Sequence, residues 1–127
     1  MVNLGDMKAS VFAPLGYGAE NENGLIALFS QDNFDALITG DIPQYAEDRL
    51  VSEKAIPDIE LLVAGHHGSK YSTSEYLLDS LKPETAVISV GENTYGHPTP
   101  EVLERLLSRG IDVFRTDTNG NIKVTSE

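Results

Sequence analysis

The stretch that decides the fold of this chain is Leu61-Leu62-Val63-Ala64-Gly65-His66-His67-Gly68-Ser69. Its apolar beginning predicts a short buried strand over residues 60–64. Two adjacent histidines follow the strand, and Gly68 and Ser69 then let the backbone turn away. The whole chain holds only three histidines. Two titratable rings at the end of one buried strand therefore indicate a functional role for at least one of them.

Strand and helix patterns alternate on both sides of this stretch. Strands are predicted over residues 34–39 and 85–90, and a weakly patterned helix with Pro43 in its first turn over 44–54. The next helix should begin at the capping-box pair Ser72 and Glu75 and stop at Pro83. A third helix should begin at Thr99-Pro100-Glu101, end at Gly110, and bury a stripe made of Val102, Leu103, Leu106 and Leu107.

The two ends of the chain carry hairpin signals. An edge strand is predicted over residues 8–12, followed by a turn at 14–18 and a loop at 20–24. Two strands around Asp32-Asn33, over residues 25–29 and 34–39, predict a hairpin. Strands over 112–116 and 121–125 flank Asn119-Gly120, the strongest short hairpin signal in the chain. Residues 1–127 thus form a single α/β unit, without repeats or linkers.

Chemically useful side chains follow three successive predicted strands. Asp41 follows the first, His66 and His67 the second, and His97 the third. Helices that cross between the strands make them parallel, so their carboxyl ends share one edge of the sheet, where open α/β sheets bind ligands. Asp41 could instead begin the following helix, and His97 could hold a structural turn. Ser69 is disfavoured as a nucleophile because no nucleophile elbow surrounds it.

Composition limits the kinds of function. The formal charge of −11 over 127 residues argues against a passive binder of phosphate backbones, but bound divalent cations would reverse the local field for an enzyme. With no cysteine, any metal must be held by histidine and carboxylate, which suits zinc, manganese or iron. No apolar run approaches the roughly 20 residues that span a bilayer, and we expect neither a membrane segment nor a signal peptide.

A series of motifs resembles a known family. In order, they are Asn21-Glu22-Asn23, Thr39-Gly40-Asp41, Gly65-His66-His67-Gly68-Ser69, Ile88-Ser89-Val90-Gly91, Tyr95-Gly96-His97-Pro98, and Phe114-Arg115-Thr116-Asp117 followed by Asn119-Gly120. The series resembles the carboxyl-terminal half of the metallo-β-lactamase-like domain in the DNA-internalization competence protein (ComEC) family, from Asn21 nearly to the last residue.

The resemblance implies the second half of a four-layer αββα sandwich, with a mixed sheet and helices on one side. It implies a metal-dependent phosphodiesterase or nuclease linked to DNA uptake, with a dinuclear zinc or manganese centre in the complete domain. Asp41 would bridge the metals, and His67 is favoured over His66 as a ligand. His66 would then contact substrate, and His97 would hold a phosphate or donate a proton. The implied location is a soluble domain of a bacterial membrane protein, outside the cytoplasmic membrane.

The chain also departs from the family. The early His-x-His/Asp-x-Asp-His motif, which supplies most of the metal ligands, has no counterpart here, because every histidine lies at or after position 66. We therefore expect a fragment of a larger domain that needs its amino-terminal half or a second chain. Alone it should bind metal weakly and have little activity. The alternatives are hydrolysis of a choline phosphoester, an acyl ester or a lactone, or a non-catalytic scaffold.

Overall fold

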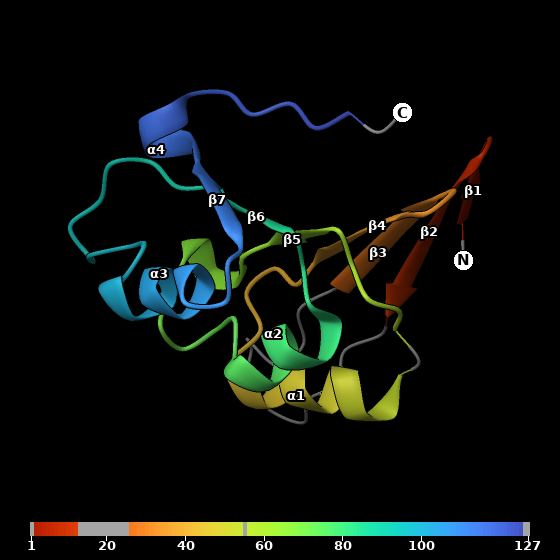
Figure 1. Ribbon diagram of the computed structural model, residues 1–127, viewed down its shortest axis with the longest axis horizontal. Coiled ribbons are helices and arrows are strands. Elements are labelled where there is room, and N and C mark those ends of the chain that lie inside the picture. The colour runs from red at the N-terminus through yellow and green to blue at the C-terminus, as the bar shows by residue number, and fades with distance from the viewer. Residues whose placement is uncertain (1, 13–25, 55, 126–127) are drawn as a thin grey trace.

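The computed structural model describes residues 2–12, 26–54 and 56–125, and the backbone alone for residues 2–4 (Figure 1). The turn and loop predicted between residues 14 and 24 lie outside the described residues. The part that is described contains seven strands in one sheet, and their spatial order is their order in the chain: β1 (Val2–Leu4), β2 (Met7–Phe12), β3 (Ile26–Gln31), β4 (Phe34–Ile38), β5 (Leu61–Val63), β6 (Thr85–Ile88) and β7 (Asp112–Arg115).

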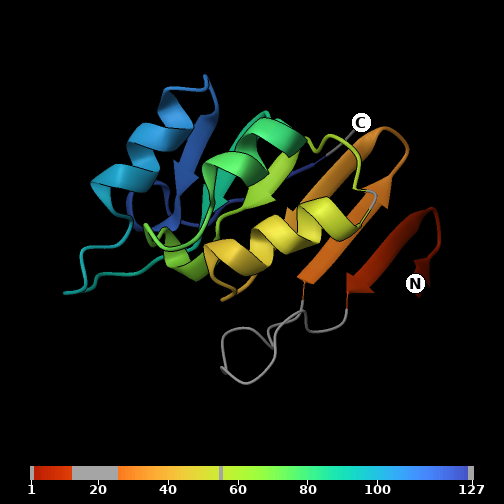
Figure 2. The same cartoon turned by 90° about the horizontal axis from the view of Figure 1, so that it is seen from below.

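The sheet is mixed. Strands β1 to β4 are antiparallel, whereas β4 to β7 are parallel. The parallel strands are connected through α1 (Gln44–Glu53), α2 (Glu75–Leu81) and α3 (Pro100–Leu107). These helices lie on one face of the sheet, while α4 (Thr116–Asn119) and the C-terminal segment lie on the other (Figures 1 and 2). The predicted mixed sheet with connecting helices on one side is confirmed, and the complete four-layer sandwich stays a prediction.

The hydrophobic core fills the space between the sheet and the three helices. Leu28, Leu37, Leu62 and Ala86 are successive cross-strand partners on β3 to β6, and all four are buried. They belong to one cluster with the buried helix residues, which include Leu50, Leu77, Leu78, Leu81 and Leu106. Burial of this apolar surface supplies most of the driving force that holds helices to sheet.

The opposite face of the sheet is also apolar. A second row of cross-strand partners runs through six strands, and its members are Val11, Ala27, Ile38, Val63, Val87 and Phe114. Val11 is 54% exposed and Phe114 44% exposed, at the two ends of this row. A sheet that is apolar on both faces is typical of a sheet that is covered on both sides. We call this second surface the open face.

Most of the predicted elements are confirmed. The hairpin turns at Asp32-Asn33, and Thr99 caps α3 by accepting a hydrogen bond from the Val102 amide. Three details are wrong. Strand β2 is not an edge strand, because β1 pairs with it. Pro43 is the N-cap of α1 and precedes its first turn. Leu107 is 62% exposed and lies outside the buried stripe.

The predicted start of α2 is also wrong. Its N-cap is Ser74, whose hydroxyl oxygen accepts a hydrogen bond from the Leu77 amide at 3.0 Å. Ser72 is buried and its hydroxyl has other partners. The capping-box spacing was therefore misleading, because a tertiary contact takes the hydroxyl that the pattern assigned to the helix.

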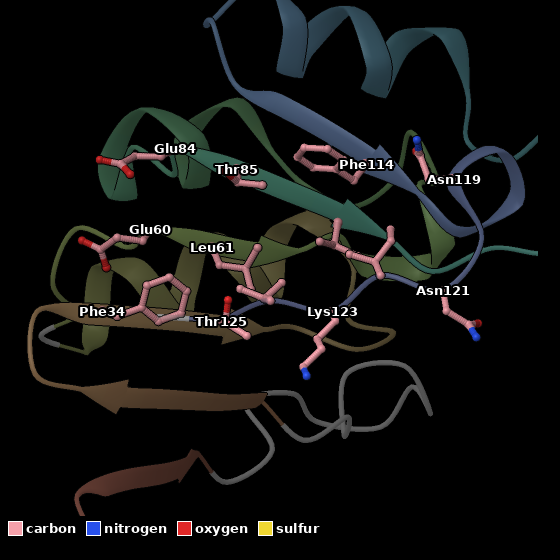
Figure 3. Close-up of a pocket in the computed structure, with 13 residues that line it drawn as sticks. Phe34, Glu60, Leu61, Glu84, Thr85, Phe114, Asn119, Asn121, Lys123 and Thr125 are labelled. Atoms are coloured by element: carbon pink, nitrogen blue, oxygen red, sulfur yellow. The ribbon is translucent and has the colours of Figure 1, made fainter. Parts of the chain in front are cut away.

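The predicted C-terminal hairpin is wrong as well. The Arg115 amide donates to Asn119 Oδ1 at 2.8 Å, and the Arg115 guanidinium pairs with Asp117 at 2.7 Å. These local bonds close the short α4 in place of a strand-to-strand turn. Residues 121–125 form no strand. Figure 3 shows Asn121, Lys123 and Thr125 along the open face. None of the helices in the described ranges is long and apolar enough to cross a bilayer.

The central position of Leu62 gives a test of the fold. Leu62 is fully buried in the middle of the sheet, whereas Leu107 is largely exposed on α3. We expect Leu62→Ala to lower the free energy of unfolding by about 2–5 kcal/mol, through lost burial and a residual cavity. Leu107→Ala should change it by roughly 0.5 kcal/mol or less. Urea denaturation followed by circular dichroism measures both, and equal effects would contradict the assignment of the core face.

Candidate functional site

Three loops meet at the carboxyl ends of β4, β5 and β6. The loop after β5 lies in the middle, and its His66 amide donates to the Gly40 carbonyl at 3.0 Å. On its other side, the Gly68 carbonyl accepts from the Thr99 amide at 2.9 Å. Backbone bonds thus join the histidine pair to the loop that carries Asp41 and to the start of α3, two residues after His97.

Two glycines make this approach possible. A Cβ atom added to Gly65 would lie 3.0 Å from Thr39 Oγ1 and 3.1 Å from the Gly40 carbonyl oxygen. Gly68 has a φ of +87°, and its added Cβ would lie only 2.6 Å from the Pro98 Cβ. A side chain at either position would push the three loops apart. The glycines that flank the histidines are therefore requirements of packing.

The ring of His66 is held by a buried hydroxyl. Its Nδ1 lies 2.5 Å from Ser72 Oγ, and that hydroxyl donates its proton to the Ile42 carbonyl at 2.7 Å. Since a serine hydroxyl has a single proton, it must accept from His66. In the neutral ring the proton is therefore on Nδ1 and the lone pair is on Nε2. The backbone of His66 is in the left-handed region, with φ of 48° and ψ of 38°.

The ring of His67 is fixed in the same tautomer by a different partner. Its Nδ1 lies 2.6 Å from the carbonyl oxygen of Ser89, just after β6. A carbonyl oxygen can only accept, so Nδ1 carries the proton and Nε2 carries the lone pair. A histidine whose Nδ1–H is anchored to a backbone carbonyl is the usual form of a metal-ligating histidine. His67 is exposed.

His97 comes close to His67. Both line a pocket of about 240 Å³ together with Val90, Gly91, Glu92, Asn93 and Tyr95. The His97 backbone is clamped by Asn93, whose Oδ1 accepts from the His97 amide at 3.0 Å and whose Nδ2 donates to the His97 carbonyl at 2.8 Å. The rings of Tyr95 and His97 lie 5.8 Å apart. The predicted grouping of these two histidines is therefore present in the structure.

Asp41 is exposed and directly follows Gly40, the residue bonded to His66. It is not the N-cap of α1, because Pro43 has that position. Ser69 is buried, and its hydroxyl accepts from the Tyr71 amide at 3.2 Å, which fits a structural role. In the described ranges no three histidine, cysteine, aspartate or glutamate side chains form a group that could hold a metal.

Sequence reasoning missed the residues that orient the rings. Ser72 lies six positions after His66, and Ser89 lies 22 positions after His67. Neither spacing corresponds to a known local hydrogen-bonding pattern, and the capping-box pattern predicts a helix cap at Ser72 instead. Another hollow, with a volume of about 580 Å³, lies between the open face and the C-terminal segment (Figure 3). Phe34, Leu61 and Phe114 are among its lining residues, and no histidine lines it.

Three known proteins are similar to this chain, although no family model matches it. It is 34% identical over 128 residues to ComE operon protein 3 of Bacillus subtilis (strain 168), an alignment of 97% of this chain and 16% of that protein. It is 36% identical over 107 residues to Recombination protein 2 of Haemophilus influenzae, an alignment of 84% of this chain and 13% of that protein. It is 40% identical over 89 residues to Competence protein ComA of Neisseria gonorrhoeae, an alignment of 68% of this chain and 13% of that protein.

These relatives support a competence-related family. The chain spans between 13% and 16% of the length of these relatives. The alignment with the Bacillus subtilis protein takes in nearly the whole chain, so it covers the loops that carry Asp41, the histidine pair and His97.

Gly68 provides a test of how tightly the three loops pack. We expect Gly68→Ala to lower the free energy of unfolding by about 2–4 kcal/mol, because it adds a clash with Pro98 to the strain of a left-handed backbone. Gly110→Ala is the matched control, since Gly110 also has a positive φ but nothing lies within 4 Å of an added Cβ. Its cost should be about 1 kcal/mol. Equal losses in urea denaturation would show that the contact with Pro98 is not tight.

Proposed function

We propose that this chain carries the carboxyl-terminal side of the site of a metal-dependent phosphoester hydrolase, which in the longer protein is a nuclease of DNA uptake. One observation carries the proposal: two adjacent histidines at a strand end are both fixed with the proton on Nδ1 and the lone pair on Nε2. The names of the relatives, which refer to competence and recombination, support DNA as the substrate.

Two of the residues present carry donor atoms that suit a divalent metal. Asp41 and His67 would hold it, because a carboxylate and an anchored neutral imidazole are suitable donors for zinc or manganese. When bound, such ions would supply an activated water molecule and stabilise the charge that develops on the phosphoryl oxygens. The Ser89 carbonyl fixes the tautomer that ligation by His67 requires.

Two further side chains would act on the substrate. His66, held by Ser72, contacts the phosphoester beside the metal-binding residues. His97 lines the pocket that His67 also lines, and from there it holds a phosphate oxygen or donates a proton to the leaving oxygen. The clamp by Asn93 keeps the loop that carries His97 in place.

The remaining ligands would come from another part of the same longer protein. A catalytic metal usually has about three protein ligands, and a dinuclear centre needs more than Asp41 and a histidine pair supply. The open face gives such a part a place to dock, because its apolar row crosses six strands. At least 84% of each relative lies outside the region of similarity, which is ample for a second sheet layer.

Substitutions in a longer protein that contains this chain test the proposed ligands. We expect Asp41→Ala and His67→Ala each to lower metal content and to reduce cleavage of DNA by about 100-fold or more, since a metal ligand is lost. Asp112→Ala is the matched control, because Asp112 is an exposed aspartate at the opposite end of the parallel strands and should leave both unchanged.

Metal analysis by mass spectrometry and cleavage of plasmid DNA are the measurements. Full metal content and activity in both variants would contradict the site. Cleavage of a choline phosphoester, an acyl ester or a lactone in place of DNA would keep the metal site but contradict the substrate. Absence of any hydrolysis by the longer protein would favour a scaffold.

The chain by itself gives a second test. We expect the 127 residues alone to bind zinc or manganese weakly and to hydrolyse DNA far below typical enzyme rates of about 1–10³ s⁻¹, because ligands are missing. Isothermal titration calorimetry and a plasmid assay measure both quantities. Turnover at ordinary enzyme rates would contradict the proposal that the site needs another part of the protein.

A further inference from the structure

We propose that Glu47 and Arg105 are positioning residues for His66: from two different helices they hold the turn of residues 72–74, and Ser72 in that turn fixes the His66 ring. The importance of His66 for catalysis rests on the proposed function. The positioning itself rests on contacts within this chain alone, and it can be tested without metal or substrate.

The carboxylate of Glu47 binds both amides of the turn. Its Oε2 accepts from the Thr73 amide at 2.8 Å, and its Oε1 accepts from the Ser74 amide at 2.9 Å. Glu47 is fully buried, with 0% exposure, in the first turn of α1. Glutamate is almost never fully buried unless specific partners compensate for its desolvation. Here the partners are two backbone amides of a turn 26 and 27 positions away.

Arg105 binds the same turn from α3. Its Nη1 donates to the Ser72 carbonyl at 3.2 Å and to the Thr73 carbonyl at 2.8 Å. Glu47 therefore accepts hydrogen bonds from two amides of this short segment, and Arg105 donates hydrogen bonds to two of its carbonyls. Together the two side chains satisfy backbone groups that neither a helix nor a strand satisfies.

The turn needs this support because its backbone is strained. Thr73 has a φ of +58°, which is a rare conformation for a β-branched residue. Its Oγ1 is buried without a hydrogen-bond partner among the residues described. Such a conformation persists only where the surroundings impose it. Without Glu47 or Arg105 we expect the turn to relax and Ser72 to leave its place between Ile42 and His66.

The turn is thus the connection between the two helices and the site. Ser72 Oγ donates to the Ile42 carbonyl and accepts from His66 Nδ1. If Ser72 moves, His66 loses the acceptor that keeps the proton on Nδ1. An imidazole without that acceptor populates both tautomers, and the Nε2 lone pair is then blocked by a proton for part of the time. His67 is held separately by Ser89 and should not respond.

The titration of Glu47 gives a second observable. Burial is the main cause that raises the pKa of Glu47 to about 7; Asp48 contributes to the rise, and the Thr73 and Ser74 amides and Arg105 oppose it. A folded-state pKa above the ordinary value means that the folded chain holds this proton more tightly than the unfolded chain. The contribution to stability is fully present below pH 4.5 and is lost as the pH rises through about 7.

The test of positioning uses the whole 127-residue chain with ¹⁵N-labelled histidine. Long-range ¹H–¹⁵N spectra report the tautomer of each neutral ring. We expect the Nδ1–H form of His66 to dominate in the wild type. Glu47→Gln, Arg105→Gln and Ser72→Ala should each shift the His66 tautomer ratio by about fivefold, the effect of losing one ordinary hydrogen bond. His67 should keep its tautomer in all variants, which makes it an internal control.

Glu53→Gln is the matched control, since Glu53 is an exposed glutamate at the end of α1 that pairs with Arg49. A wild-type His66 tautomer in folded Glu47→Gln and Arg105→Gln, together with a shift in Ser72→Ala, would overturn the proposal. If Glu47→Gln does not fold, Arg105→Gln decides by the same criterion. A nuclease assay that finds no activity would contradict the proposed function, but it would leave the tautomer result unchanged.

The pH dependence of folding tests whether Glu47 is buried as a carboxyl group with a raised pKa. We expect the ratio of the folding constants of wild type and Glu47→Gln to fall by about 100-fold between pH 5 and pH 8, because glutamine does not titrate. Urea denaturation at a series of pH values measures this ratio. A ratio that stays constant or rises with pH would show that Glu47 is not held in this buried position.

Discussion

The structure depends on the close packing of one glycine-containing turn between two neighbouring loops. Gly65 is pressed against Thr39 and Gly40 on one side, and Gly68 is pressed against Pro98 on the other. The parallel arrangement of β4, β5 and β6 brings the three loops to one edge of the sheet, but only residues without side chains allow them to touch. Asp41, the histidine pair and His97 are placed by this constraint.

The hydrogen-bond partners of the two histidine rings determine which ring nitrogen carries the proton. His66 and His67 have different Nδ1 partners, a serine hydroxyl and a backbone carbonyl, and both partners leave the lone pair on Nε2. That hydroxyl belongs to a strained turn, which Glu47 of α1 and Arg105 of α3 hold through hydrogen bonds to its amides and carbonyls. The helical layer therefore does more than cover the core, because it also orients a ring at the edge of the sheet.

Local signals in the sequence predicted the elements that depend on local interactions. The hairpin at Asp32-Asn33, the strand before the histidines and the Thr99 cap of α3 follow from hydrophobic periodicity and turn residues. The parallel connection of the strands then predicted which loops would meet. The contacts of Ser72 and Glu47 could not be predicted, because each joins residues that lie far apart in the chain or at spacings without a local signal.

The C-terminal hairpin failed for a related reason. Asn119-Gly120 is a strong hairpin signal, but Arg115 binds Asp117 and Asn119, and these bonds close a helical turn that includes Asn119. The alternating residues beyond, Ile122 and Val124, lie along the open face without pairing as a strand. Alternation of apolar and polar residues in this segment therefore does not indicate a strand.

We propose that Asp41 and His67 form one side of a metal site, with His66 beside His67 in the same turn. Paramagnetic broadening by Mn²⁺, followed by NMR on the isolated chain, tests it directly because it detects even weak binding. We expect selective broadening of the amides of residues 40–41 and 65–68, with Glu60, Glu84 and Asp112 at the opposite end of the parallel strands little affected. Broadening that follows the acidic residues of that opposite end and spares the histidine turn would contradict it.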